Sequence, residues 1–178
     1  MIGIVGNGTD KWTIKGYLQM INVVRYLIKK YNPEEVCSGD SPMLGVDKEV
    51  KLNTPENRYK NFPARPLTSG RWSSWKVSGG YRDRNLQIAE SRIVFVIVAD
   101  SYPAEYRDKR EKICYHCKES RPWHCKSGAC WTGLQAMKKG NKAIWVIIPN
   151  YGTPYFLDNA YLGKAFGDEV TLISVTVK

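Results

Sequence analysis

Apolar residues occur along the chain in blocks whose spacing predicts strands and helices in turn. Ile93 to Ala99 is apolar at seven consecutive positions, as expected of a central strand in a parallel sheet covered on both faces. Ala143 to Ile148 repeats this pattern, whereas the segment 13–30 carries its apolar residues at helical spacing. The pattern predicts strands at residues 2–5, 35–37, 60–62, 93–99, 143–148 and, at an edge, 170–177, and helices at 13–30, 45–51, 81–90 and 129–139.

This alternation predicts a Rossmann-like α/β fold, a doubly wound and mostly parallel sheet with helices on both faces. The length of 178 residues fits a single domain that spans residues 1–178. A cysteine- and histidine-rich stretch at 101–128 is expected to form a small zinc-knuckle-like insert. In such sheets ligands bind in the crevice at the carboxyl ends of the strands.

The apolar runs are too short for a membrane protein, since the longest has seven residues and a spanning helix needs about 20. The first residues read directly into a strand without the features of an export signal. We therefore expect a cytoplasmic protein without a membrane partner. Its five cysteines are then expected to be thiols or metal ligands.

The net charge of +10 is large for this length, and it is unevenly distributed. Between Ser101 and Ala143 there are ten Lys or Arg residues and four Asp or Glu residues. Such an excess favours an anionic partner, which includes nucleotides, nucleic acids and phosphorylated metabolites. A basic surface that only keeps the protein soluble explains the same charge.

A group of cysteines and histidines gives the clearest indication of chemistry. Cys114 and Cys117 form a C-x2-C pair, which presents two thiolates to one tetrahedral ion, and His124, Cys125 and Cys130 compete for the remaining places. A shell of four protein ligands makes the expected Zn²⁺ structural. The alternatives are a redox-active C-x2-C pair and cysteines that only fill the core.

Small residues follow three of the predicted strands, at Gly6-Asn7-Gly8, Ser38-Gly39 and Ser127-Gly128. Such residues let backbone N–H groups approach a phosphate, although tight turns use glycine in any case. Arg84 begins a helix at the same edge of the sheet, where a guanidinium can grip a phosphate with two hydrogen bonds. The alternative to a ligand role is that Arg84 lies in a solvated first turn of the helix.

Three segments together resemble the SLOG superfamily, and in particular its YpsA-related branch. They are Ser38-Gly39 followed by Gly45-Val46-Asp47, the helix with Arg84-Asn85 before the apolar strand, and the glycine loop from Lys126 to Thr132. The resemblance covers about residues 1–150 and implies a Rossmann-like domain that binds a nucleotide or a nucleotide derivative. The residues that it places in the ligand site are Gly6, Asn7, Gly8, Ser38, Gly39, Asp47, Arg84, Asn85, Ser127, Gly128 and Thr132.

The chain departs from the related phosphoribohydrolases at their catalytic glutamate, near which it has Gln135. An amide cannot act as a general acid or base, so nucleotide binding or sensing is the preferred function. A nucleotide-cleaving hydrolase is the first alternative, with Asp47, Asp83 or Asp100 in place of the glutamate. The second is a nucleic-acid-binding protein that stacks bases on Tyr115, His116 and Trp123.

The position of Cys130 links the expected metal site to the last of the predicted phosphate loops. Cys130 follows Ser127 and Gly128 within one turn, so a metal bound there would also hold the last phosphate loop in shape. We therefore rank Cys114, Cys117, His124 and Cys130 as the ligand set, with Cys125 as the substitute. The sequence is also compatible with a homo-oligomer.

Overall fold

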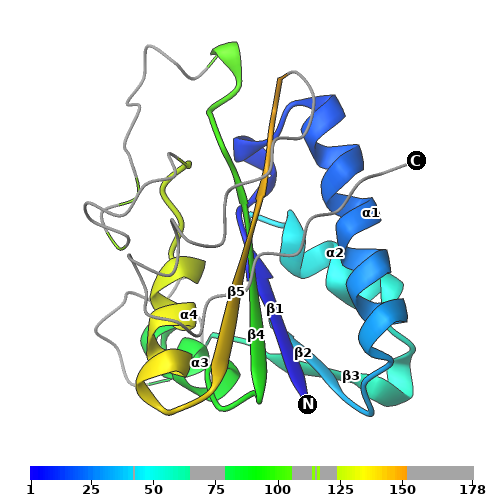
Figure 1. The fold of residues 1–178 in the computed structure, drawn as a ribbon, viewed down its shortest axis with the longest axis vertical. Helices are drawn as coiled ribbons and strands as arrows, with labels where there is room; N and C mark the ends of the chain where they lie inside the picture. Colours follow the sequence, from blue (N-terminus) through cyan, green and yellow to red (C-terminus); the bar gives the residue numbers. More distant parts are fainter. Residues whose placement is uncertain (42, 65–78, 106–113, 115, 117–123, 152–178) are drawn as a thin grey trace, which may run out of the picture.

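The computed structural model describes residues 1–41, 43–64, 79–105, 114, 116 and 124–151. Five parallel strands form one sheet in the order β3-β2-β1-β4-β5 (Figure 1). The strands are β1 (Ile2–Gly6), β2 (Val36–Gly39), β3 (Tyr59–Phe62), β4 (Ile93–Ala99) and β5 (Lys142–Ile148). The helices are α1 (Ile14–Tyr31), α2 (Val46–Asn53), α3 (Tyr81–Ile88) and α4 (Ala129–Lys138), with short 3-10 turns η1 (Thr9–Lys11) and η2 (Glu56–Arg58).

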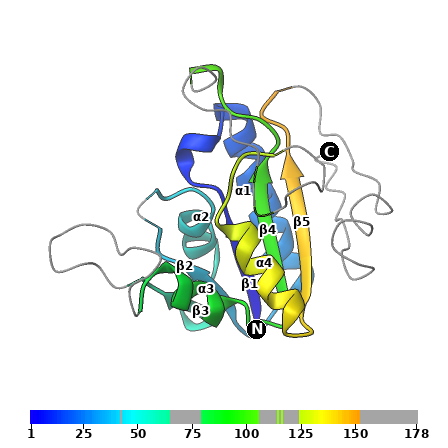
Figure 2. The same cartoon turned by 90° about the vertical axis from the view of Figure 1, so that its left-hand side faces the viewer.

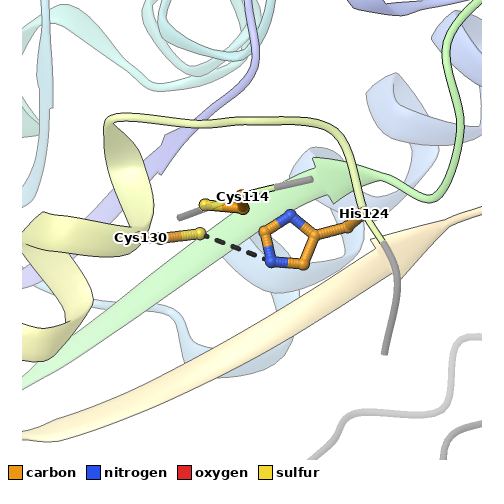
Figure 3. A group of neighbouring side chains, drawn as sticks. All are labelled: Cys114, His124 and Cys130. Atoms are coloured by element: carbon orange, nitrogen blue, oxygen red, sulfur yellow. Dashed lines mark hydrogen bonds between the residues drawn. The ribbon is translucent and has the colours of Figure 1, made fainter. Parts of the chain in front are cut away.

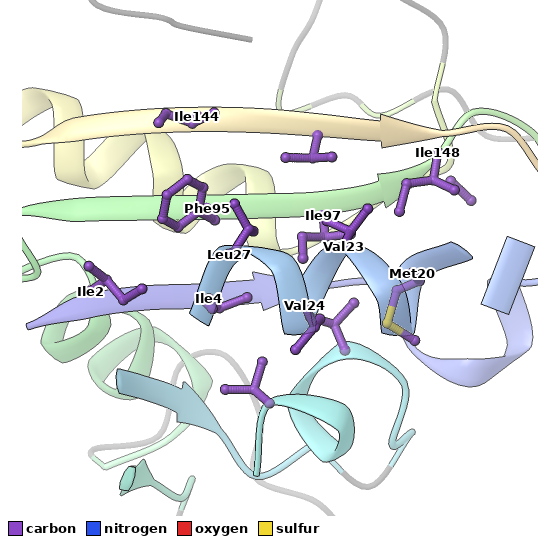
Figure 4. Packing of buried hydrophobic residues seen from close by; sticks show 14 of the residues in the cluster. Ile2, Ile4, Met20, Val23, Val24, Leu27, Phe95, Ile97, Ile144 and Ile148 are labelled. Carbon is purple, nitrogen blue, oxygen red and sulfur yellow. The ribbon is translucent and has the colours of Figure 1, made fainter. Parts of the chain in front are cut away.

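The doubly wound α/β fold is confirmed. Helices α1 and α2 cover one face of the sheet, and α3 and α4 cover the other (Figures 1 and 2). Successive residues of a strand point to opposite faces, so β4 supplies Phe95 to the first layer and Val94 to the second. Figure 4 shows the first layer, where Phe95 and Ile97 of β4 lie beside Leu27 and Val23 of α1.

The order in which strands are added to the sheet reverses at β1, whose neighbours are β2 and β4. Strands β2 and β3 are added on one side of β1, and β4 and β5 then extend the sheet on the other side of β1. The pairing of β1 with β4 ends at Gly6 and Ile97, and β4 continues to Ala99. The place beside Ala99 is taken by Cys125, whose N–H donates to the Ala99 carbonyl at 2.7 Å.

Two details at this edge differ from the expectation. Ser38 and Gly39, expected in a loop, are the last residues of β2 because their backbones pair with β3 and the Ser38 hydroxyl donates to the Ile4 carbonyl at 2.7 Å. The Gly6–Gly8 loop leads into η1 and not directly into α1. The start of α1 is capped by Thr13, whose Oγ1 accepts the Gly16 N–H at 3.1 Å.

The expected edge strand at 170–177 and most of the expected insert at 101–128 lie outside the described residues. Within the part that is described, no helix has both the length and the apolar character that a membrane crossing requires.

Candidate functional site

Cys114, His124 and Cys130 form a buried group that could hold a metal ion. One ligand atom of each residue lies within 4.8 Å of the others, and the exposed fraction is at most 4 % for all three. Cys130 comes from the first turn of α4, and His124 lies close to the end of β4 (Figure 3). The three side chains point toward one another from parts of the chain that the fold brings together.

The imidazole of His124 is oriented for a metal by its neighbour. Its Nδ1 lies 2.8 Å from the Cys125 carbonyl oxygen, which can only accept, so Nδ1 donates and carries a proton. A neutral ring then keeps its lone pair on Nε2, which lies 3.8 Å from the Cys130 Sγ. Metal-binding histidines commonly show this arrangement, with the second nitrogen donating to a carbonyl or carboxylate.

The spacing of the group suits a tetrahedral ion. A sulfur at 2.3 Å and a nitrogen at 2.1 Å from one tetrahedral centre lie about 3.6 Å apart, close to the observed separation of 3.8 Å between Cys130 and His124. Two thiols and an imidazole are a donor set that zinc prefers. The residues therefore fit the metal expected from the sequence.

Of the two remaining cysteines of the sequence cluster, Cys125 lies within the described residues. Cys125 is buried among the residues of the layer that α1 covers, whereas Cys114 and Cys130 belong to the other layer. His124, the residue before Cys125, points to the other side and belongs to the metal group, since successive residues in extended backbone point to opposite sides. Cys117, which the sequence ranks as a ligand, lies outside the described residues.

Arg84 lies at the carboxyl end of β2, together with several residues that the sequence assigns to the ligand site. Its Nε donates to the Asn85 Oδ1 at 3.1 Å, and its Nη1 lies 3.9 Å from the Asp47 Oδ2. The side chain is only 11 % exposed. Within the described part of the chain, the buried Nη1 has no hydrogen-bond partner.

Gly39 allows this close approach of the guanidinium to the strand. A Cβ at this position would lie 2.5 Å from the Arg84 Nη1 and 2.9 Å from the Asp47 Oδ2. Carbon atoms do not come this close to non-bonded neighbours without a shift of one of them. The absent side chain of Gly39 is therefore the space that the guanidinium occupies.

The Asp47 carboxyl is buried beside this cation. Burial raises its pKa, while the Arg84 guanidinium and the Ser38 hydroxyl, which donates to the Asp47 Oδ1 at 3.0 Å, oppose the rise. Burial also raises the pKa of Tyr59, and the nearby Asp47 adds to the rise. Burial in this cluster therefore disfavours the charged forms of Asp47 and Tyr59.

The sequence did not identify one further aromatic contact in this cluster. The Arg84 Cζ lies 5.0 Å from the centre of the Tyr81 ring, at a distance typical of cation–π contacts. Residues three apart on a helix lie on one face, so the spacing of Tyr81 and Arg84 in the predicted helix was the available signal.

The loop Gly6-Asn7-Gly8 packs against protein, which differs from a simple phosphate cradle. The Asn7 carbonyl accepts the Val46 N–H at 3.2 Å, at the start of α2. A Cβ on Gly6 would lie 2.2 Å from the Ile97 carbonyl oxygen, and one on Gly8 would lie 2.6 Å from the Met43 Cβ. These two glycines are required by close packing of the chain.

The last predicted loop is partly open. Gly128 is exposed, and a Cβ placed on it would contact nothing within 4 Å. Ser127 is buried, and its Oγ accepts the Ala129 N–H at 3.2 Å. Thr132 is fully buried in α4, and its hydroxyl oxygen has no hydrogen-bond partner among the described residues.

The carboxylates proposed for a hydrolase all have structural contacts. Asp83 accepts the Gly79 N–H at 2.6 Å, in front of α3. Asp100 accepts the Asn150 N–H at 2.9 Å and the Ser101 hydroxyl at 2.8 Å. Of the stacking residues proposed for nucleic acid, His116 is half-buried, and its pKa is lowered by burial. Tyr115 and Trp123 lie outside the described residues.

Comparison of the chain with protein-family models, with curated proteins and with solved structures gives no match.

Proposed function

We propose that the protein binds a nucleotide or a nucleotide-derived anion at the carboxyl edge of its sheet and carries a structural zinc ion. The observation that carries the first part is the Arg84 Nη1, a buried cationic donor without a hydrogen-bond partner in the described residues. A buried donor left unpaired costs about 1–3 kcal/mol. A phosphate oxygen that reaches this nitrogen would provide the missing acceptor.

The surroundings of Arg84 support an anion with an attached planar group. The guanidinium lies directly against the backbone of Gly39 on one side, and the Tyr81 ring lies 5.0 Å from its Cζ. Arginine binds phosphate through parallel hydrogen bonds and stacks on flat rings. This combination suits a phosphorylated nucleoside better than a bare inorganic anion.

The zinc part of the proposal rests on the Cys114, His124 and Cys130 group, with Cys117 as the fourth ligand. Four protein ligands leave no place for a reactive water, so the ion's role is structural. Metal-bound thiolates are typical of a reducing compartment, which is why we propose a cytoplasmic location. The ion would fix the first turn of α4, next to Ser127 and Gly128.

Ligand binding is tested by isothermal titration of the purified protein with nucleoside mono-, di- and triphosphates. We expect saturable binding of at least one of them, and a loss of at least tenfold in affinity for Arg84→Gln. Arg92→Gln is the matched control, because Arg92 is exposed and precedes β4 at the opposite edge of the sheet. Equal affinities for both variants, or binding of single-stranded DNA with a steep salt dependence instead, would contradict the proposal.

The metal is tested independently by elemental analysis. We expect close to one zinc per chain, lost in Cys130→Ser and retained in Cys37→Ser, whose thiol contacts Ser91 away from the group. A wild-type protein without metal after expression in zinc-containing medium, which also takes up none on titration, would refute this part.

A further inference from the structure

The side chain of Asn7 closes a ring of hydrogen bonds between β1, β4 and the segment 124–126. Its Oδ1 accepts the Ala99 N–H at 2.8 Å, and its Nδ2 donates to the Lys126 carbonyl at 3.3 Å. The ring is completed by the Cys125 N–H, which donates to the Ala99 carbonyl at 2.7 Å. Both polar groups of the Ala99 backbone are thereby paired.

Beyond the last backbone pair of β1 and β4, the side-chain amide of Asn7 makes the hydrogen bond to β4. The Asn7 N–H donates to the Ile97 carbonyl at 3.1 Å, and beyond it no β1 residue pairs with β4. A side-chain amide offers a carbonyl and an N–H like those of a peptide group. The Asn7 side chain, which is 3 % exposed, therefore extends the pairing by one step and attaches the segment 124–126 to it.

The same segment carries the metal group. His124 directly precedes Cys125, and the Cys125 carbonyl orients the imidazole through Nδ1. A displacement of 125–127 would thus move the carbonyl that orients the imidazole of His124.

We propose that Asn7 is a positioning residue for the metal group, because it fixes the segment whose Cys125 carbonyl orients His124. This inference rests on the zinc part of the proposed function. Residues that hold the ligands of a metal typically contribute 10- to 100-fold to its affinity. Asn7 acts one step further from the ion, so we expect the lower end, about a tenfold loss.

The experiment measures the zinc dissociation constant of the full chain by competition with a chromogenic chelator. Asn7→Ala removes both side-chain hydrogen bonds. Asn7→Asp keeps an acceptor for the Ala99 N–H but brings an oxygen against the Lys126 carbonyl. It also buries a carboxyl group, so its unfolding free energy is measured beside its zinc affinity. Asn53→Ala is the control, because the Asn53 amide also makes hydrogen bonds, to Arg25 and Glu49, but lies at the end of α2.

We expect zinc to bind about tenfold more weakly in Asn7→Ala and Asn7→Asp and with unchanged affinity in Asn53→Ala. A merely structural role would lower the unfolding free energy of the metal-free and zinc-loaded forms equally and leave the dissociation constant unchanged, which would overturn the inference. If Asn7→Ala does not fold, Asn7→Asp decides alone. A wild-type chain that binds no zinc would refute the proposed zinc site itself, whereas equal affinities in wild type and both variants would refute only the role of Asn7.

Discussion

Gly39→Ala would test whether the space beside β2 is reserved for the Arg84 guanidinium. The added methyl group would lie 2.5 Å from Nη1 and 2.7 Å from Cζ of Arg84, and 2.9 Å from the Asp47 Oδ2. Gly39 does not have a left-handed backbone, so the change introduces no backbone strain. The effect on the folded state therefore comes from crowding around Arg84 and Asp47.

The expected magnitude is the difference of two effects. Overpacking of a close-packed site costs about 1–3 kcal/mol, and the loss of glycine freedom in the unfolded chain returns about 0.4–1 kcal/mol. We expect a net loss of about 1–2 kcal/mol in unfolding free energy. At roughly 2–4 °C per kcal/mol for a chain of this size, the melting temperature falls by about 2–8 °C.

The assay is thermal unfolding followed by circular dichroism, together with the nucleotide titration described above. Gly128→Ala is the matched control for stability alone, because a methyl group there has open space around it, and Arg92→Gln remains the control for the titration. The unfolding free energy of Gly128→Ala is expected to stay within about 0.5 kcal/mol of wild type. Gly39→Ala is expected to lose nucleotide affinity as well, since the guanidinium is displaced. A Gly39→Ala protein as stable as Gly128→Ala and with the nucleotide affinity of the wild type would refute the assigned role of Gly39.

Three further predictions follow from the core, the buried carboxyl and the metal group. Phe95→Ala removes a fully buried ring from the layer under α1, and we expect a loss of about 3–5 kcal/mol in urea unfolding, whereas a loss under 1 kcal/mol would contradict the packing. Burial raises the pKa of Asp47 in the folded state. The contribution of Asp47 to the unfolding free energy is therefore complete below its ordinary pKa of about 3.9 and falls as the pH rises through its folded pKa. Asp47→Asn should therefore gain stability relative to wild type between pH 4 and pH 7, and a difference independent of pH would refute this. Removal of metal by a chelator should lower the melting temperature of wild type, by about 8–16 °C if zinc had been present at 1,000 times its dissociation constant, and should leave Cys130→Ser unaffected.

The main elements could be predicted from the sequence because their periodicities are strong. Ile93 to Ala99 has only apolar residues, which fixes β4 as a central strand, and the five described strands lie where the apolar blocks indicated. The end of β2 was less readable, because Ser38 and Gly39 have low strand propensity and their place in the sheet depends on pairing with β3. Tertiary pairing of this kind leaves no local signal.

The metal group likewise has one part that the sequence signals and one part that only the fold reveals. The types and spacing of Cys114, His124 and Cys130 were sufficient to single out residues that the fold brings together in a buried group that could hold a metal ion. The part played by Asn7 was not predictable, since its side chain contacts Ala99 and Lys126, which lie 92 and 119 positions further along the chain. An asparagine between two glycines is typical of a turn, and only the fold distinguishes a turn residue from one that bridges two strands.

The extended segment at 124–126 makes the protein sensitive to chain length at one place. His124 faces the metal group while Cys125 enters the layer beneath α1, so consecutive residues serve opposite sides of the sheet. Insertion or deletion of a single residue here would exchange the two sides, as a one-residue shift does in any strand. An imidazole would then enter the apolar core, and a thiol would take its place in the metal group. The segment should accept changes of side chain at Lys126 far more readily than any change in its number of residues.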